Sequence, residues 1–333
     1  MNSLSQSSLA IRLLPGILIA AAIAALATIL GGYFPLLGNL LFAILIGMLI
    51  RNTIGISPTI EHGINYTVKG FLKFAVILLG VGLNLHEIAT VGKQSFFIIF
   101  TSVCLGIILT VLVGKMLKLD NTLSLLIGVG TSICGATAIS AIKEVVKAKE
   151  NETAYAISTI VLFNLFAFFT YPIIGQFFQL SETSFGIWAG TAVHDTSSAI
   201  AVGFLYGDQA GDTATTVKLA RTLFLLPLLF LLPFIIKKSA KSKVNSSILK
   251  AFPWFILWFL LVSLLNTIGL IPEIVKIPLN DLSKFLITMV MAGVGMQVSL
   301  KELTKLGLKP LLTGLFASLC VGIISLIMIL LFI

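Results

Sequence analysis

The chain has 333 residues, of which 58% are hydrophobic and only 11% are charged, and its mean hydropathy is +1.10. Soluble domains carry roughly a quarter charged residues, so this composition excludes a soluble fold and predicts an all-α polytopic membrane protein. The formal net charge is +9, but the Lys and Arg residues lie in short loops between apolar segments, where membrane insertion explains them and a nucleic-acid partner is not expected.

Apolar stretches of spanning length predict about eleven transmembrane helices, within a range of about ten to twelve. They are expected at 11–31, 36–50, 68–85, 94–114, 122–146, 153–178, 185–206, 216–236, 251–271, 282–299 and 310–331. Pro35 separates the first two segments, Asp120 can cap the fifth, and Pro272 closes the ninth. We therefore expect a single transmembrane domain over 1–333 without a soluble domain.

The basic residues predict an orientation. With the N-terminus on one side of the membrane, that side collects 14 of the 22 Lys and Arg residues: Arg12, Arg51, Lys69, Lys73, Lys115, Lys118, Lys237, Lys238, Lys241, Lys243, Lys250, Lys301, Lys305 and Lys309. The positive-inside rule places this side in the cytoplasm, with 237–250 as a cytoplasmic basic loop and the C-terminus outside. Further spans follow the first one, so it is interpreted as a retained signal anchor.

The three cysteines predict no metal site and no disulfide framework. Cys104, Cys134 and Cys320 all lie in apolar segments, without the Cys-x-x-Cys or Cys/His spacing that such sites require. We expect free thiols, no metal and no cofactor.

Two short pieces of sequence occur twice, in the same order. Gly-Val-Gly-Leu-Asn at 80–84 and Ser-Val-Cys-Leu-Gly-Ile at 102–107 recur as Gly-Val-Gly-Met-Gln at 293–297 and Ser-Leu-Cys-Val-Gly-Ile at 318–323. In the predicted topology the two copies run in opposite directions through the membrane. Inverted repeats of this kind are typical of secondary transporters, whose substrate site lies near the midplane where the halves meet.

We therefore expect a first repeat over about 36–178 and a second over about 185–331. The amides of Asn84 and Gln297 occupy matching positions in the two copies, which predicts that both line the substrate site. Close helix packing through Gly-x-Gly and neighbouring small residues is the alternative explanation of the repeated pieces.

Two further segments, 130–139 and 190–201, share the pattern Gly-Thr-small-β-branched followed by a polar or glycine centre. Glycine and hydroxyl residues in mid-span let a helix break and expose backbone N–H groups to an anion. The residues expected to bind the solute are Thr131, Ser132, Cys134, Gly135, Thr196 and Ser197. Bonding of the hydroxyls to their own helices is the alternative. Eleven unbroken crossings make the two segments parallel, so either one is re-entrant or the repeats are not cleanly divided.

His194 and Asp195 stand at the centre of the second segment, deep in apolar sequence, where a charged residue usually faces a cavity, an ion path or a partner charge. Three interpretations stay open: a proton relay, a Na⁺ site built on the carboxylate, and a structural ion pair with Arg221. An enzyme with Ser197 or Ser198 as nucleophile is not expected, because neighbouring positions on one helix point about 100° apart.

Lys218 and Arg221 lie three residues apart at the start of the next apolar helix, and therefore on one helix face. If that face points inward, the two cations can neutralise an anionic solute, or Arg221 can pair with Asp195. If it points outward, they anchor the helix at the interface.

Three motifs together resemble a known family: Gly-Thr-Ser-Ile-Cys-Gly at 130–135, Val-His-Asp-Thr-Ser at 193–197 and Val-Lys-Leu-Ala-Arg at 217–221. They resemble the YeiH-like bacterial membrane proteins, often labelled sulfate exporters, over nearly the whole chain. That family is similar to the wider cation:proton antiporter and anion transporter superfamily. The resemblance implies inverted repeats, interrupted helices near the midplane and location in a bacterial cell membrane.

The sequence as a whole predicts a secondary transporter that moves a small, sulfate-like anion across the cell membrane with proton coupling, and not an enzyme. Asp195 with His194 is expected to carry the proton, and Lys218 and Arg221 to supply positive charge to the anion. The alternatives are a Na⁺-coupled organic-anion transporter and an anion channel without coupling. The expected partners are the anion, the coupling proton or Na⁺, and membrane lipid, with a homodimer left open.

Overall fold

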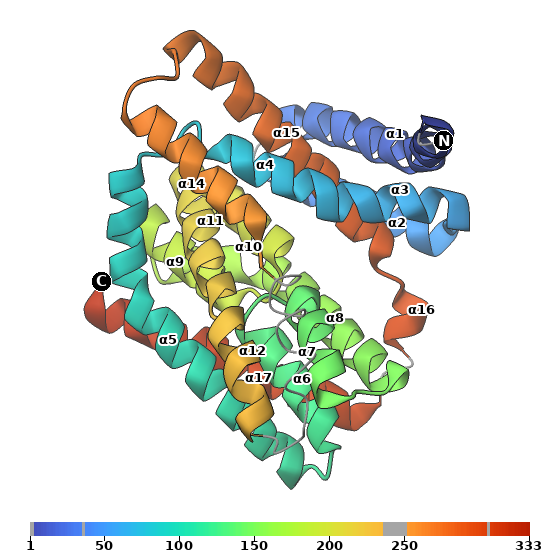
Figure 1. The fold of residues 1–333 in the computed structure, drawn as a ribbon, viewed down its shortest axis with the longest axis vertical. Helices are drawn as coiled ribbons and strands as arrows, with labels where there is room; N and C mark the ends of the chain where they lie inside the picture. Colours follow the sequence, from blue (N-terminus) through green and yellow to red (C-terminus); the bar gives the residue numbers. More distant parts are fainter. Residues whose placement is uncertain (1–2, 35–36, 236–251, 305–306) are drawn as a thin grey trace. The chain divides into compact units, whose positions relative to one another are not determined.

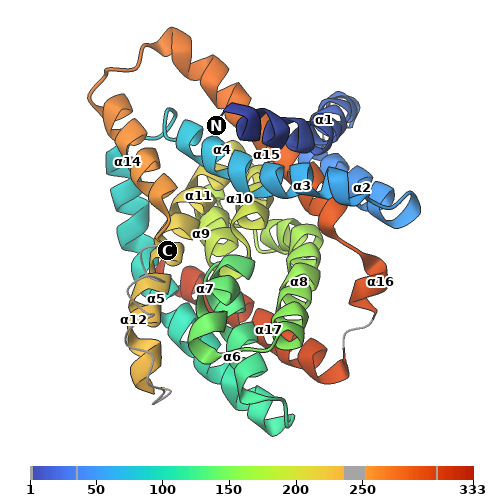
Figure 2. The same ribbon diagram turned by 45° about the vertical axis from the view of Figure 1, so that its right-hand side comes forward.

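The computed structural model describes residues 3–34, 37–235, 252–304 and 307–333, and throughout these residues its regular structure is helical (Figures 1 and 2). Six helices are long and apolar enough to cross a membrane: Arg12–Tyr33, Leu85–Met116, Glu150–Phe177, Asp208–Leu232, Glu273–Gln297 and Leu308–Phe332. Shorter apolar helices accompany them. The expected all-α polytopic membrane fold is confirmed. The basic loop 237–250, together with Lys305, lies outside the described residues.

The chain divides into two compact units, and the first contains Met1–Leu85 and Phe255–Lys301. Its helices are α1 (Ser3–Tyr33), α2 (Gly38–Thr53), α3 (Pro58–Tyr66), the π-helical turn η1 (Thr67–Phe71), α4 (Leu72–Leu79), most of α14 (Trp254–Thr267) and α15 (Glu273–Gln297). A Cβ atom on Gly63 would lie 2.7 Å from the Cα of Gly16, so α1 and α3 meet where neither has a side chain. Small residues let these backbones approach closely.

Within this first unit, α15 runs antiparallel to α3 and α4. Gln297 at the end of α15 donates to the Oδ1 of Asn65 on α3 over 2.7 Å, whereas Asn280 near the other end lies against Gly82, just beyond α4. Asn84 follows Gly82 and is 3.5 Å from the Thr267 hydroxyl. The repeated pieces 80–84 and 293–297 therefore end at opposite ends of an antiparallel pair, about 25 Å apart along α15.

The second unit contains His86–Trp254 and Glu302–Ile333. Its helices are α5 (Leu85–Met116), α6 (Asn121–Ser132), α7 (Ala136–Val146), α8 (Glu150–Phe177), α9 (Glu182–Ala192), α10 (Thr196–Tyr206), α11 (Asp208–Leu223), α12 (Leu225–Ile235) and α17 (Leu308–Phe332), while the short α16 (Leu300–Leu303) spans the boundary between the units. Both segments expected to be broken in mid-span, 130–139 and 190–201, belong to this unit.

Helices α9 and α10 fold back on each other and form a re-entrant hairpin. The hydroxyl of Tyr206, the last residue of α10, donates to the carbonyl of Leu180, just before α9, over 2.7 Å. The rings of Tyr206 and Phe185 stack with their centroids 3.8 Å apart. Because these two ends of the hairpin meet, residues 193–195 form its tip.

Helices α6 and α7 form a second structure of the same kind. A Cβ atom on Gly130 would lie 2.9 Å from the Cδ1 of Ile139, although a continuous helix would place these residues about 13 Å apart. The chain therefore turns back at 133–135, where Gly135 adopts φ +65°. We call α6–α7 the first hairpin and α9–α10 the second hairpin.

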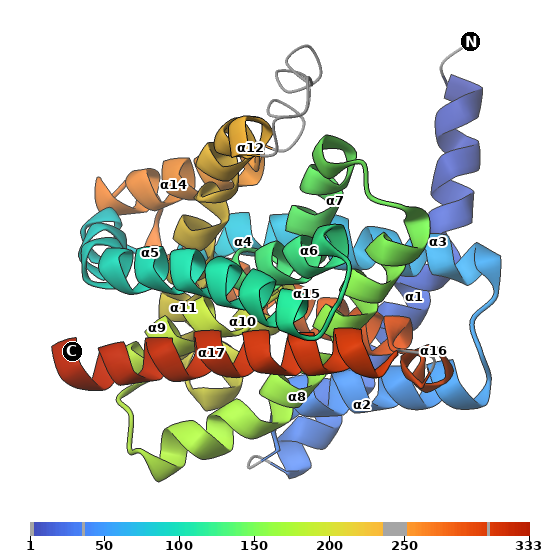
Figure 3. The same ribbon diagram turned by 90° about the horizontal axis from the view of Figure 1, so that it is seen from below.

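The two hairpins enter the second unit from opposite ends. A three-residue link joins the end of α7 to the start of α8, and α8 then runs 28 residues to the start of the second hairpin (Figure 3). Both segments thus turn back instead of making unbroken crossings, while the inverted repeats stay a prediction. Lys143, Lys147 and Lys149 consequently lie at the same end of this unit as Lys115 and Lys118, which strengthens the basic bias predicted for the cytoplasmic side.

Candidate functional site

Helix α11 brings Lys218 and Arg221 into the interior of the second unit. It packs along both helices of the second hairpin. The backbones approach closely because glycines face α11, namely Gly186 and Gly190 of α9 and Gly203 of α10. Lys218 and Arg221 share one face of α11, and both side chains are 0% exposed. Two fully buried cations in an apolar bundle require dense polar contacts, and charged residues in such places usually mark a functional pathway.

Lys218 uses all three of its N–H groups to join the tips of the hairpins. Its Nζ donates to the carbonyl oxygen of Ile133 in the first tip over 3.1 Å, and to those of Val193 and His194 in the second tip over 2.7 and 2.6 Å. An ammonium group has three donors and no acceptor, so its hydrogen-bonding capacity is filled.

Arg221 joins the same two tips. Its Nε donates to Ser132 O over 2.7 Å and its Nη1 to Val193 O over 2.9 Å, while Nη2 donates to Thr131 O. In the described chain it forms no ion pair with Asp195. The last carbonyls of a helix have no partner within the helix and carry its negative dipole end, so cations stabilise the C-terminal ends of α6 and α9.

Asp195 occupies the opposite kind of helix end. It is the N-cap of α10, and its Oδ2 accepts hydrogen bonds from the backbone N–H of Ser197, over 3.1 Å, and from the Ser197 hydroxyl. A carboxylate is favourable at a helix N-terminus because the first N–H groups lack partners there and the dipole is positive. The side chain is half-buried, whereas residues 191–194 are fully buried. Asp195 is therefore the accessible group of this tip.

Asn164 of α8 fixes the backbone of the second tip. Its Oδ1 accepts the N–H groups of His194 and Asp195, each over 3.1 Å. The His194 ring is 1% exposed, and its Nε2 lies 3.0 Å from the hydroxyl of Ser318 on α17. Its other nitrogen, Nδ1, is buried without a hydrogen-bond partner in the described chain. One ring nitrogen thus remains for a water.

The N-terminus of α7 lies beside Asp195. A Cβ atom on Gly135, the N-cap of α7, would be 3.2 Å from both the Cα and the Oδ1 of Asp195. Gly135 provides no side-chain cap, and Thr137 in the first turn of α7 is exposed. The positive ends of α7 and α10 thus flank one accessible carboxylate, an arrangement that suits a second small anion.

The structure gathers ten of the residues predicted from the sequence around the two tips: Thr131, Ser132, Cys134, Gly135, His194, Asp195, Thr196, Ser197, Lys218 and Arg221. Thr131 and Ser132 take part through backbone carbonyls, and the Ser132 hydroxyl has no partner in the described chain. Asn84 and Gln297 belong to the first unit, where both are exposed and hydrogen bond within that unit. Their role at the substrate site stays a prediction.

The site also contains residues that were not predicted: the carbonyls of Ile133 and Val193, and the side chains of Asn164 and Ser318. Asn164 is the single amide within the apolar stretch 154–175 of α8, and an isolated polar residue in mid-span is a signal of function that could have identified it. In the sequence, Ser318 stands out only as part of the repeated pieces. Its role depends on α17 passing His194, which the sequence does not encode locally.

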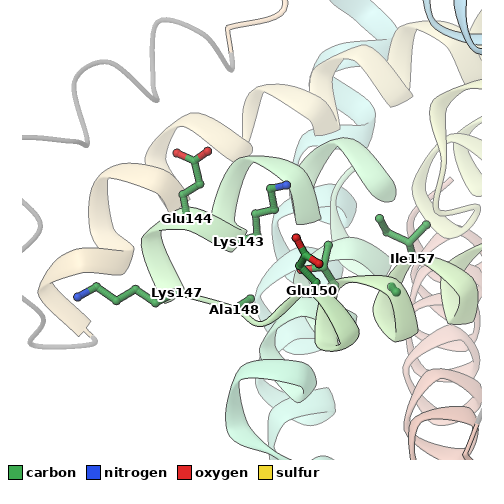
Figure 4. Close-up of a pocket in the computed structure, with 8 residues that line it drawn as sticks. Lys143, Glu144, Lys147, Ala148, Glu150 and Ile157 are labelled. Atoms are coloured by element: carbon green, nitrogen blue, oxygen red, sulfur yellow. The ribbon is translucent and has the colours of Figure 1, made fainter.

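A hollow of about 520 Å³ lies where α7 gives way to α8, lined among others by Lys143, Glu144, Lys147 and Glu150 (Figure 4). The lining mixes both signs of charge, and these side chains are solvent-exposed. It lacks the buried polar groups of the tips. Across the described residues, His, Cys, Asp and Glu nowhere gather in a group that could hold a metal ion.

Known proteins resemble this chain over nearly its full length. The family model described as Conserved hypothetical protein 698 matches residues 15–314. A UPF0324 membrane protein of Clostridium tetani is 36% identical over 328 residues, covering 93% of this chain and 94% of the relative. One of Streptococcus pyogenes serotype M18 is 41% identical over 329 residues, covering 96% and 97%. One of Fusobacterium nucleatum is 37% identical over 330 residues, covering 93% and 95%.

Proposed function

This chain belongs to the family described as Conserved hypothetical protein 698, whose relatives include UPF0324 membrane proteins, and we propose that it is a proton-coupled secondary transporter of a small, sulfate-like anion. In this proposal the protein acts in the cell membrane, with its N-terminus in the cytoplasm, and it is not an enzyme. The transported anion and a proton are its small-molecule partners.

The meeting of the two hairpin tips carries the proposal. Helices that stop in mid-bundle are the usual way in which secondary transporters present helix ends to a solute near the midplane. Here the hairpins enter from opposite ends, and their tips share the ligands Lys218 and Arg221. Such a construction gives each side of the membrane one hairpin that leads to the same group of residues.

Charge favours an anion as the solute. The tips hold two buried cations and one carboxylate, so their sum is positive by one charge when Asp195 is ionised and by two when it is protonated. A divalent oxyanion matches the protonated state. The N–H groups in the first turns of α7 and α10 can provide donors for its oxygens.

Asp195 supports proton coupling because it is the accessible acid at this site. An anion bound beside the α10 N-terminus would repel an ionised carboxylate a few ångströms away, which favours its protonated form. Binding of the anion and binding of the proton are then linked, as coupling requires. His194 lies next to it with one unpartnered ring nitrogen and can relay the proton.

Sodium coupling is less well supported. Sodium sites in broken helices use carbonyl oxygens of unwound segments and helix C-terminal ends. In both tips those oxygens accept hydrogen bonds from Lys218 and Arg221 instead. These carbonyl oxygens are therefore not available to bind Na⁺ together with the carboxylate of Asp195.

The test is flux of labelled sulfate into proteoliposomes with and without an imposed pH gradient, comparing the wild type with Asp195→Asn. Asparagine can still accept the Ser197 N–H at the N-cap but cannot carry a proton. We expect gradient-driven accumulation in the wild type and loss of at least about tenfold in the variant, while exchange of sulfate across the membrane persists. A pH-sensitive dye trapped inside the vesicles should report proton movement with sulfate.

Asp120→Asn is the matched control. Asp120 caps α6 by accepting the Thr122 N–H over 2.7 Å, so the same substitution removes a capping carboxylate away from the tips. This variant should retain gradient-driven flux. Flux that ignores the gradient and survives Asp195→Asn would contradict the coupling role and favour the channel alternative. Flux that requires Na⁺ in place of choline would favour the sodium alternative.

A further inference from the structure

We propose that the two hairpin tips form a monovalent-cation site that the ammonium group of Lys218 fills permanently. The site consists of three backbone carbonyl oxygens, those of Ile133, Val193 and His194. Its ligand class is a small monovalent cation, with ammonium as the best match. In the wild-type protein the cation is tethered to α11, so no free ion is needed there.

The geometry of the oxygens is that of a cation cage. All three lie between 2.6 and 3.1 Å from a single atom, Nζ of Lys218, and they come from two separate hairpins. Backbone carbonyls arranged around one point replace the hydration shell of an ion in many membrane proteins. The same oxygens stand at the C-terminal ends of α6 and α9, where the helix dipoles add negative potential.

Apart from Lys218 Nζ, the Val193 oxygen also accepts a hydrogen bond from Arg221 Nη1 over 2.9 Å. Ile133 and Val193 are the C-cap residues of α6 and α9, so their carbonyls lie beyond the regular hydrogen bonds of these helices. Both residues are 0% exposed, which leaves no bulk water to satisfy them. An unpaired buried carbonyl is costly, so this arrangement requires a donor or a cation at its centre.

The cage also explains how the hairpins are held together. Ile133 belongs to the first tip, whereas Val193 and His194 belong to the second, so the cation is shared between hairpins of opposite orientation. Arg221 adds a second bridge through Ser132 and Val193. If the proposed transport function holds, the two tips move as one body and Na⁺ is not carried at this position. The cation site itself does not depend on that function.

The experiment removes the tether and offers free cations. Lys218→Ala deletes the ammonium group and leaves space at the cage, whereas Lys218→Met fills much of the same volume with an apolar side chain. The purified, detergent-solubilised full-length variants are heated in choline chloride and in ammonium, methylammonium, potassium or sodium chloride. A ligand that binds only the folded state raises its Tm in a saturable manner.

We expect the Tm of Lys218→Ala to fall in choline and to recover with increasing ammonium concentration, with a smaller recovery in potassium or sodium. The wild type and Lys218→Met should show no such specific response, because the cage is filled in both. A Lys218→Ala protein that is as stable as the wild type, or that responds to no cation, would overturn the proposal. So would one that aggregates in every salt, since a carbonyl cage should accept a free ion.

A second readout follows the tips directly. Cys134 lies between Ile133 and Gly135 and is 1% exposed, so its alkylation requires the tips to part. In a background with Cys104→Ala and Cys320→Ala, Lys218→Ala should react severalfold faster in choline than the parent, and ammonium should restore the slow rate. Neither readout uses a transported solute. A positive result with no sulfate flux would therefore keep the cation site and contradict only the proposed function.

Discussion

The first and second hairpins share a backbone plan but differ in what surrounds their returning helices. Each sends one helix inward, exposes its last carbonyls to the cations of α11, and turns back at a three-residue tip. In the second hairpin, residues 196–203 of α10 are buried throughout. In the first, Thr137, Ser140 and Lys143 of α7 are exposed.

The tips differ as well. The first tip, 133–135, has a glycine at φ +65° as the N-cap of α7 and no side chain to cap it. The second tip, 193–195, has a histidine held by Ser318, an acid that caps α10, and an amide from α8 that holds its backbone. The second hairpin thus holds the groups that can exchange a proton, while the first contributes backbone and an accessible helix end.

Loss of Arg221 should have the largest effect on the two hairpins, because its guanidinium donates to two carbonyls at the end of α6 and to one carbonyl of the second tip. Arg221→Ala leaves the Thr131 and Ser132 oxygens without this donor, while the Val193 oxygen keeps Lys218 Nζ, and we expect a destabilisation of about 2–6 kcal/mol because each unsatisfied buried carbonyl costs about 1–3 kcal/mol. Chemical unfolding in mixed micelles measures it. Arg12→Ala, which removes an exposed arginine near the N-terminus, should change stability by less than about 0.5 kcal/mol.

The hydrogen bonds of Arg221 predict which hairpin loosens in Arg221→Ala. Two of the three Arg221 bonds go to the first hairpin, so Cys134 in the first tip should become more reactive toward alkylating reagents in Arg221→Ala. An Arg221→Ala protein of wild-type stability with Cys134 still protected would show that Lys218 alone holds the tips together.

Much of this site could be predicted from the sequence. Composition predicted the helical membrane fold, and the two Gly-Thr motifs marked the places where helices stop. The i, i+3 spacing of Lys218 and Arg221 put both on one face, and the structure shows that this face points inward. These inferences succeeded because they depend on local periodicity and on the cost of placing polar groups in an apolar segment.

The direction of the chain after each break could not be predicted. The segments 122–146 and 185–206 are long enough to cross a membrane, and glycine permits a helix to stop without setting the angle at which the next one starts. The contacts that reverse the chain are distant in sequence: Lys218 lies 85 residues from Ile133, and Ser318 lies 124 residues from His194. Tertiary partners decided between spanning and re-entrant forms.

Gly135→Ala should have an intermediate effect and tests the closeness of the first hairpin to the acid of the second. Gly135 has φ +65° and ψ −134°, a backbone region essentially restricted to glycine, so alanine there should cost about 1–3 kcal/mol, and the new methyl group would also lie 3.2 Å from Asp195 atoms. Gly55→Ala is the control, because Gly55 has φ +81° with open space around it. Both variants place alanine at a positive φ and should lose stability through backbone strain, but only Gly135→Ala should change the pH dependence of sulfate flux. Equal pH profiles would mean that α7 does not influence Asp195.

Ser318→Ala should have the smallest effect, and it isolates the support that α17 gives to the second tip. The substitution leaves both ring nitrogens of His194 without a protein partner, so we expect a loss of about 0.5–1.5 kcal/mol, the usual net value of one hydrogen bond. Ser325→Ala is the matched control: Ser325 is buried on the same helix, but its hydroxyl bonds to the Val321 carbonyl of α17 itself over 2.6 Å. Thermal unfolding compares the stability of the two variants, and the rate of Cys134 alkylation compares the exposure of the first tip. Because Ser318 reaches the second tip through His194 and, within the described residues, forms no hydrogen bond with the first tip, Ser318→Ala should lower stability more than Ser325→Ala and leave Cys134 protected. Equal losses would mean that the bond to His194 adds nothing beyond packing, and faster alkylation would mean that disturbance of one tip passes to the other through Lys218 and Arg221.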